Sequence, residues 1–155
     1  MKTLQSAAPK LPSTYAEVLA PLDMARLPEA LQQLAAADPL IARFITALDQ
    51  VHREEKVSSW SQWTQAQAAG WAAQDHRLFS RLRGYSDEQI EQFEQYLELA
   101  RQVDAKYGEQ IAIELNYTVQ QACSTPAFEA VERQLFAMGR AALERIGLGG
   151  TVDAL

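Results

Sequence analysis

The segment from Ser86 to Gly108 restricts most narrowly what this chain can fold into. Apolar residues recur there every three or four positions, which is the spacing of one face of an α-helix. Ser86 is followed three residues later by Gln89, so each side chain can cap the other's backbone in the first turn, and Gly108 is a common C-terminal stop. The segment therefore predicts a long amphipathic helix that needs other elements to cover its apolar side.

The other periodic segments of the chain also have helical spacing, and prolines and glycines fall mostly between them. Asp38-Pro39 combines a capping side chain with a proline suited to a first helical position. We expect helices over 14–20, 28–37, 39–56, 59–83, 86–107, 109–122 and 126–146. Segment 109–122 also alternates like a strand, but no second strand is expected to pair with it, so we predict a helix. The fold class expected is all-α, a compact bundle of six to seven helices.

Length and composition are those of one soluble domain. The 155 residues are 48% hydrophobic and 22% charged. A chain of this length and composition can bury a core without disulfide bonds or structural metal ions. We expect a single domain over 1–155, with flexible ends at 1–12 and 148–155. The first residues lack the apolar run of a signal peptide, no apolar run is long enough for a membrane span, and Cys123 is the single cysteine, so we expect neither secretion nor a membrane span. We therefore expect a cytoplasmic protein.

The charge balance limits the partners that the chain can take. The net charge is −6, which disfavours nucleic acid and anionic membrane surfaces. Four carboxylates lie almost opposite the apolar side of the Ser86–Tyr107 segment: Asp87, Glu91, Glu94 and Glu98. These residues form either a solvated outer face or a docking surface for a basic protein partner.

The segment 58–84 holds all three tryptophans and is expected to form one long helix over 59–83. On such a helix one face would carry Trp60, Trp63, Gln67, Trp71 and Gln74, followed by Leu78 and Leu82. Amides among aromatic rings suit a binding face, because a buried amide needs hydrogen-bond partners. The alternative is an ordinary core stripe with the glutamines at its margin.

Catalytic and metal-binding signatures are not found. There are only two histidines and one cysteine, so a histidine- or cysteine-rich metal site is excluded. His52 and Glu55 are three positions apart and could bind one metal ion together. The alternative is that His52 is a partly buried histidine that is hydrogen-bonded to a neighbour. We expect no enzyme activity, no metal and no cofactor.

Trp71, Phe93 and the run Tyr85-Ser86-Asp87-Glu88 resemble part of the pattern of TipAS-type drug-binding domains, and 128–139 is loosely similar to their terminal helix. The resemblance covers about a third of the chain. It implies a helical domain that holds an antibiotic-like molecule against aromatic residues.

Two hypotheses for function follow. The first is a non-enzymatic module that engages another protein, as an inhibitor, immunity protein, chaperone or regulator, through the tryptophans and the acidic stripe. The second is a small-molecule sensor or sequestering protein, with an apolar pocket between 59–83 and the terminal helix. Its lining would be Trp71, Phe79, Phe128 and Met138. A homodimer through one helical face is compatible with either.

Overall fold

The computed structural model describes residues 11–57, 64–145 and 147. Among them the fold is all-α, as predicted, with seven α-helices and no strand. The helices are α1 (Glu29–Ala37), α2 (Pro39–Glu54), α3 (Gln65–Ala72), α4 (His76–Leu82), α5 (Asp87–Tyr107), α6 (Ile111–Cys123) and α7 (Pro126–Arg145). Two 3₁₀ turns, η2 (Tyr15–Glu17) and η3 (Met24–Arg26), precede them. No described helix is long and apolar enough to cross a membrane.

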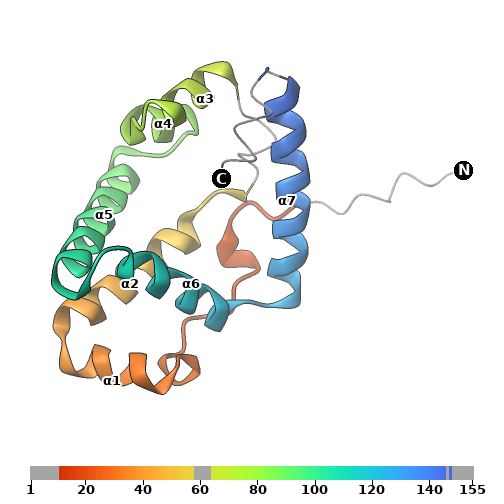
Figure 1. Cartoon of the computed structure of the whole chain (residues 1–155). Coiled ribbons are helices and arrows are strands. Elements are labelled where there is room, and N and C mark those ends of the chain that lie inside the picture. The colour runs from red at the N-terminus through yellow and green to blue at the C-terminus, as the bar shows by residue number, and fades with distance from the viewer. Residues whose placement is uncertain (1–10, 58–63, 146, 148–155) are drawn as a thin grey trace, which may run out of the picture.

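Helix α2 is the centre of the main core. Figure 1 shows it crossing the molecule, with α1, α5 and α6 around it. Its buried face consists of Ile41, Phe44, Ile45 and Leu48, each at most 1% exposed. Val103 of α5 and Val119 of α6 complete the same cluster. Burial of one such side chain contributes about 1.5–3 kcal/mol, so this cluster is the main source of stability.

Local capping chemistry confirms the predicted starts of α2 and α5. The Asp38 carboxylate accepts a hydrogen bond from the Leu40 amide at 3.0 Å and begins α2. Ser86 and Gln89 form the reciprocal capping box that begins α5. Asp38 also accepts hydrogen bonds from Lys106 and Tyr107 at the end of α5, and these bonds lower its pKa to about 2. The start of α2 is therefore held to the end of α5.

The single long helix expected over 59–83 is wrong. The described part forms two helices, α3 and α4, because the backbone turns left-handed at Gln74 with φ +57°. The Asp75 amide donates to the Gly70 carbonyl at 3.0 Å and the Gln74 amide to the Trp71 carbonyl at 3.0 Å, which closes α3 as a Schellman motif. The Asp75 carboxylate then accepts from the Leu78 amide and begins α4.

The short helix expected after Thr14 is replaced by the 3₁₀ turn η2. The Thr14 side chain makes no capping bond, and the Glu17 carboxylate instead accepts from the Ser13 amide and hydroxyl. The segment 109–122, which fitted both helix and strand, is helical as α6.

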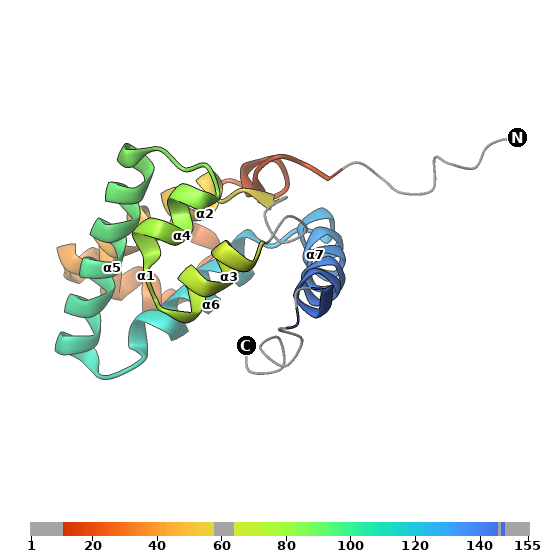
Figure 2. The same cartoon turned by 90° about the horizontal axis from the view of Figure 1, so that it is seen from above.

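Helix α7 lies on the far side of the molecule from α5 (Figures 1 and 2). Its start is fixed by Thr125, whose hydroxyl accepts from the Phe128 amide and donates to the Val18 carbonyl at 2.6 Å. Val131 and Leu135 pack with Val57 in a second, smaller cluster. Leu11, expected in the flexible leader, packs against this cluster. Residues 1–10 and 148–155, the rest of the expected flexible ends, lie outside the described residues.

Candidate ligand-binding pocket

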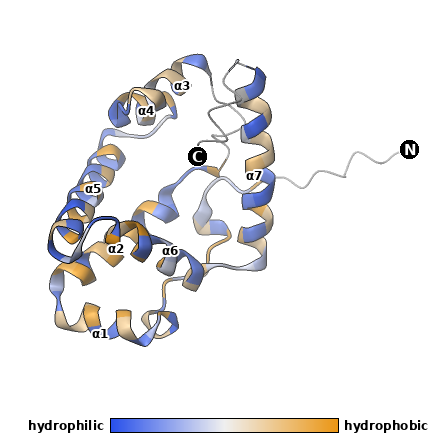
Figure 3. Ribbon diagram, viewed as in Figure 1, coloured by the Kyte–Doolittle hydropathy of each residue, from blue (hydrophilic) through white to orange (hydrophobic). Residues whose placement is uncertain are grey.

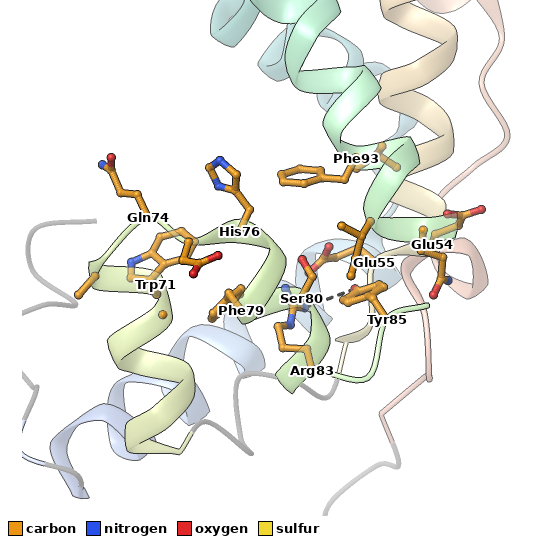
Figure 4. Close-up of a pocket in the computed structure, with 16 residues that line it drawn as sticks. Glu54, Glu55, Trp71, Gln74, His76, Phe79, Ser80, Arg83, Tyr85 and Phe93 are labelled. Carbon is orange, nitrogen blue, oxygen red and sulfur yellow. Dashed lines mark hydrogen bonds and ion pairs between the residues drawn. The ribbon is translucent and has the colours of Figure 1, made fainter. Parts of the chain in front are cut away.

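A pocket of about 820 Å³ lies where the end of α2, helices α3 and α4, and the start of α5 meet (Figure 4). Its apolar lining comes from four aromatic rings, Trp71, Phe79, Tyr85 and Phe93, with Val51 and Ile90. Its polar lining includes Glu54, Glu55, Gln74, Asp75, His76, Ser80, Arg83 and Gln89. This volume and this mixture of apolar walls with a few polar groups are typical of small-molecule sites.

The turn between α3 and α4 brings two of the aromatic rings together. Trp71 near the end of α3 and Phe79 of α4 have ring centroids 5.4 Å apart in a tilted arrangement. The Gly70 backbone lies beside Phe79, since a Cβ built there would be in ordinary van der Waals contact with the Phe79 backbone at 3.6 Å. Phe79 is buried, whereas Trp71 is 42% exposed. Trp71 therefore stands where the pocket meets solvent.

The opposite wall belongs to α5 and is continuous with the main core. Phe93 stacks on Tyr96 with ring centroids 6.0 Å apart, and Tyr96 stacks on the buried Phe44 at 5.5 Å. His76 of α4 contacts the Phe93 ring edge-on at 6.2 Å. These rings connect the pocket wall to α2, so this side of the pocket has rigid support.

An ion pair closes the base of the pocket between α2 and α4. The Arg83 guanidinium donates to the Glu55 carboxylate, and the Arg83 side chain is only 10% exposed. It also lies over the rings of Phe79 and Tyr85, at 5.2 and 5.1 Å from their centroids. Its charge is therefore met by a carboxylate and two aromatic faces.

Tyr85 is a neutral polar group in the wall. Burial, with the nearby Glu55 charge as a lesser cause, raises the pKa of Tyr85 to about 12. The hydroxyl oxygen accepts a hydrogen bond from the Lys56 amide at 2.8 Å. The phenol therefore keeps its proton at neutral pH.

The pocket brings together only part of the predicted binding face. Trp71 and Gln74 line it, and both are exposed. Gln67 does not line it: it is buried, its side-chain oxygen accepts from the Thr64 amide in the α3 capping box, and its Nε2 donates to the Leu82 carbonyl at the end of α4. Trp60 and Trp63 lie outside the described residues. The glutamines thus have two separate roles, because α3 and α4 do not share one face.

The predicted acidic stripe lies outside the pocket, and much of it is paired with arginine. Glu94 accepts from Arg77, Glu98 accepts from Arg101, and Asp87 lies 3.9 Å from the Arg81 Nε. Glu91 is exposed.

The prediction of a pocket between 59–83 and the terminal helix is wrong about the second wall. Trp71 and Phe79 do line one cavity, but the facing residues come from α2 and α5. Phe128 instead packs edge-on against Tyr15 at 5.5 Å in the core, and Met138 does not line the pocket.

Sequence reasoning missed Glu54, Glu55 and Arg83 as pocket residues. The available signal was the position of Arg83 two residues before Tyr85, since a guanidinium near an aromatic ring can pack over its face.

His52 lies away from the pocket, between α2 and α6. Its Nε2 is 3.2 Å from the Asn116 Oδ1 and 3.0 Å from the Gln120 Nε2. Burial lowers the pKa of His52. Within the described ranges no group of three or more His, Cys, Asp or Glu side chains is placed to hold a metal ion.

Comparison with known proteins gives no relative, since no family model, no curated protein and no solved structure matches this chain. Of the aromatic residues on which the expected resemblance to TipAS-type domains depends, Trp71, Tyr85 and Phe93 line the pocket, whereas Phe128 lies in the core.

Proposed function

We propose that this protein is a non-enzymatic binding module that holds a small, largely apolar molecule between α3–α4 and α5. The observation that carries the proposal is the pocket of about 820 Å³ with four aromatic rings in its walls. Sequestering or sensing such a molecule needs only enclosure, contact area and a few orienting groups. The resemblance to TipAS-type domains supports the same function only through Trp71, Tyr85 and Phe93, which line this cavity; the other residues of the resemblance, 86–88 and 128–139, do not.

The polar groups of the pocket suit orientation of a ligand. Tyr85 keeps its proton and Glu55 is held by Arg83, so both present fixed partners at the base of the cavity. Trp71 at the entrance adds a large aromatic surface whose exposure a ligand would reduce. Apolar contact with these rings would supply most of the binding free energy.

A neutral fluorescent probe, N-phenyl-1-naphthylamine, tests the proposal directly. We expect the full chain to bind it with a rise in probe fluorescence. Ala72→Phe places a ring in the pocket and should weaken binding at least about tenfold, which corresponds to about 1.4 kcal/mol.

Ala69→Phe is the matched control, because Ala69 is an exposed α3 residue that does not line the pocket. It should leave binding unchanged. Equal binding by both variants, or no binding by the unmodified chain, would contradict the proposal.

A second candidate is the engagement of another protein. Exposed apolar side chains on α3 and α4 favour it: Trp71, Leu78 and Leu82 are 42%, 44% and 42% exposed. Such residues anchor protein interfaces. Native mass spectrometry of the protein enriched from its host should then show a stoichiometric protein complex that Leu78→Glu removes. A copy carrying only an added mass of a few hundred daltons supports the pocket instead.

A further inference from the structure

We infer that the ligand of this pocket is a hydrophobic cation, such as an aromatic amine or an onium compound. This inference rests on the proposed function and adds a charge requirement to it. It depends on two features of the lining: an excess of carboxylates and a set of aromatic faces.

The ionisable side chains of the lining include three carboxylates and one guanidinium, from Glu54, Glu55, Asp75 and Arg83, together with the His76 imidazole. The guanidinium and one carboxylate neutralise each other, since Arg83 donates to Glu55. Glu54 and Asp75 form no salt bridge with any described residue. The carboxylates therefore outnumber the cations, even when Lys56 over the Tyr85 ring is counted, and this excess favours a cationic ligand over an anionic one.

The aromatic walls are suited to the same charge. A cation is attracted to the face of an aromatic ring, and tryptophan is the strongest partner. Arg83 already uses this interaction at the base of the pocket, over Phe79 and Tyr85. The rings of Trp71 and Phe93 line the rest of the cavity and can serve a ligand in the same way.

The arrangement leaves room for a bulky cation. Figure 4 shows Trp71 and Gln74 at one end of the pocket and Glu54 at the other, with His76, Phe79 and Phe93 between them. Asp75 follows directly on Gln74, so the two carboxylates belong to different ends. A cation whose charge is spread over several rings would contact apolar walls along its length and carboxylates at both ends.

Two ions of nearly equal size and shape test this inference. Tetraphenylphosphonium and tetraphenylborate differ chiefly in the sign of their charge. Isothermal titration calorimetry of each into the full chain should give at least about tenfold tighter binding of the phosphonium. Each ion should also displace N-phenyl-1-naphthylamine in proportion to its affinity.

The variant Glu54→Gln/Asp75→Asn removes the two carboxylates and keeps their size. Asparagine can still cap α4 in place of Asp75. We expect this variant to lose most of the preference for the phosphonium over the borate, a ratio of two affinities that is measured within the same variant. The control Glu109→Gln/Glu114→Gln removes two charges from exposed residues away from the pocket and should keep the preference.

The outcomes separate the two proposals. If the neutral probe binds in the pocket but the borate binds as tightly as the phosphonium, the cation inference is wrong and the proposed function stands. A control variant that loses as much preference as the pocket variant also overturns the inference, because overall charge would then explain it. If the neutral probe itself fails to bind, both proposals fall together.

Discussion

Helices α2 and α5 border two apolar regions that differ in packing: a closed region, the core around the middle of α2, and an open region, the pocket beside α3 and α4. Around the middle of α2 the apolar side chains are fully enclosed, with Phe44 and Leu48 at 0% exposure. Around α3 and α4 the apolar side chains line a cavity or face solvent, as Trp71 and Leu82 do. Figure 3 shows hydrophobic residues in both regions, so hydrophobic content alone does not decide which region closes.

The difference teaches that closure depends on how much of each helix packs against its neighbours. Helices α2 and α5 are 16 and 21 residues long, and they pack along several turns. Helices α3 and α4 are 8 and 7 residues long and meet at a turn. Two short helices that fold back on each other present few side chains to α5. A space therefore remains between these helices and α5.

The largest expected effect separates the closed region from the open one. Phe44→Ala should lower the free energy of unfolding by about 3–5 kcal/mol, because it leaves a cavity in a fully packed cluster. Phe93→Ala should cost less than about 2 kcal/mol, because its ring already borders an open space that can adjust. Urea unfolding followed by circular dichroism measures both.

Equal costs for Phe44→Ala and Phe93→Ala would show that the pocket wall is as tightly packed as the core. That outcome would also weaken the proposed function, since no ligand space would remain.

A smaller effect concerns the turns that keep α3 and α4 short. Gln74 has a left-handed backbone, so Gln74→Gly should raise stability by about 0.5–1 kcal/mol. Gly84 has φ +86°, so Gly84→Ala should lower it by about 1 kcal/mol. Thermal unfolding of the two variants against the unmodified chain gives the signs. A loss of stability on Gln74→Gly would mean that α3 and α4 join in solution, as the sequence pattern suggested.

The smallest expected effect is a pH dependence of folding stability that comes from His52, at the contact of α2 with α6. Burial lowers the pKa of His52 in the folded protein below its ordinary value of about 6.5. As the pH falls through that value, the unfolded chain takes up a proton more readily than the folded one, so stability declines. The contribution of neutral His52 to stability is fully present above its unfolded-state pKa. It is lost as the pH falls toward its lower folded-state pKa.

His52→Gln should make the decline below about pH 6.5 shallower while leaving the pocket's probe binding unchanged. Melting temperatures of both proteins between pH 5 and pH 8 provide the measurement. Parallel curves for the two proteins would show that another group controls this range.

Much of the fold could be predicted because helix ends depend on neighbouring residues. Asp38, Ser86 and Gly108 act on backbone groups within a few positions, and the structure places helix ends where they indicated. The break at Gln74 was missed because glutamine is an uncommon left-handed residue. Asp75 was the available signal, since aspartate before a helical segment is a common cap.

Only one wall of the pocket could be predicted from the sequence. Trp71 and Phe79 are near neighbours in sequence, so their shared cavity follows from local structure. Glu55 and Arg83 pair across 28 positions, and sequence spacing does not show which helices meet in space. For the same reason the opposite wall was assigned to the terminal helix instead of α5.

One consequence follows from the separation of the two apolar regions. No residue of α3 or α4 belongs to the main core cluster around α2. Mutations at the exposed α3–α4 positions of the pocket, such as Trp71 and Gln74, can therefore accumulate with less penalty to folding than mutations of the buried Phe79. Such a scaffold is well suited to diversification: related chains could keep the α2 core while the α3–α4 segment changes to accept different molecules, and directed evolution of ligand preference should begin there.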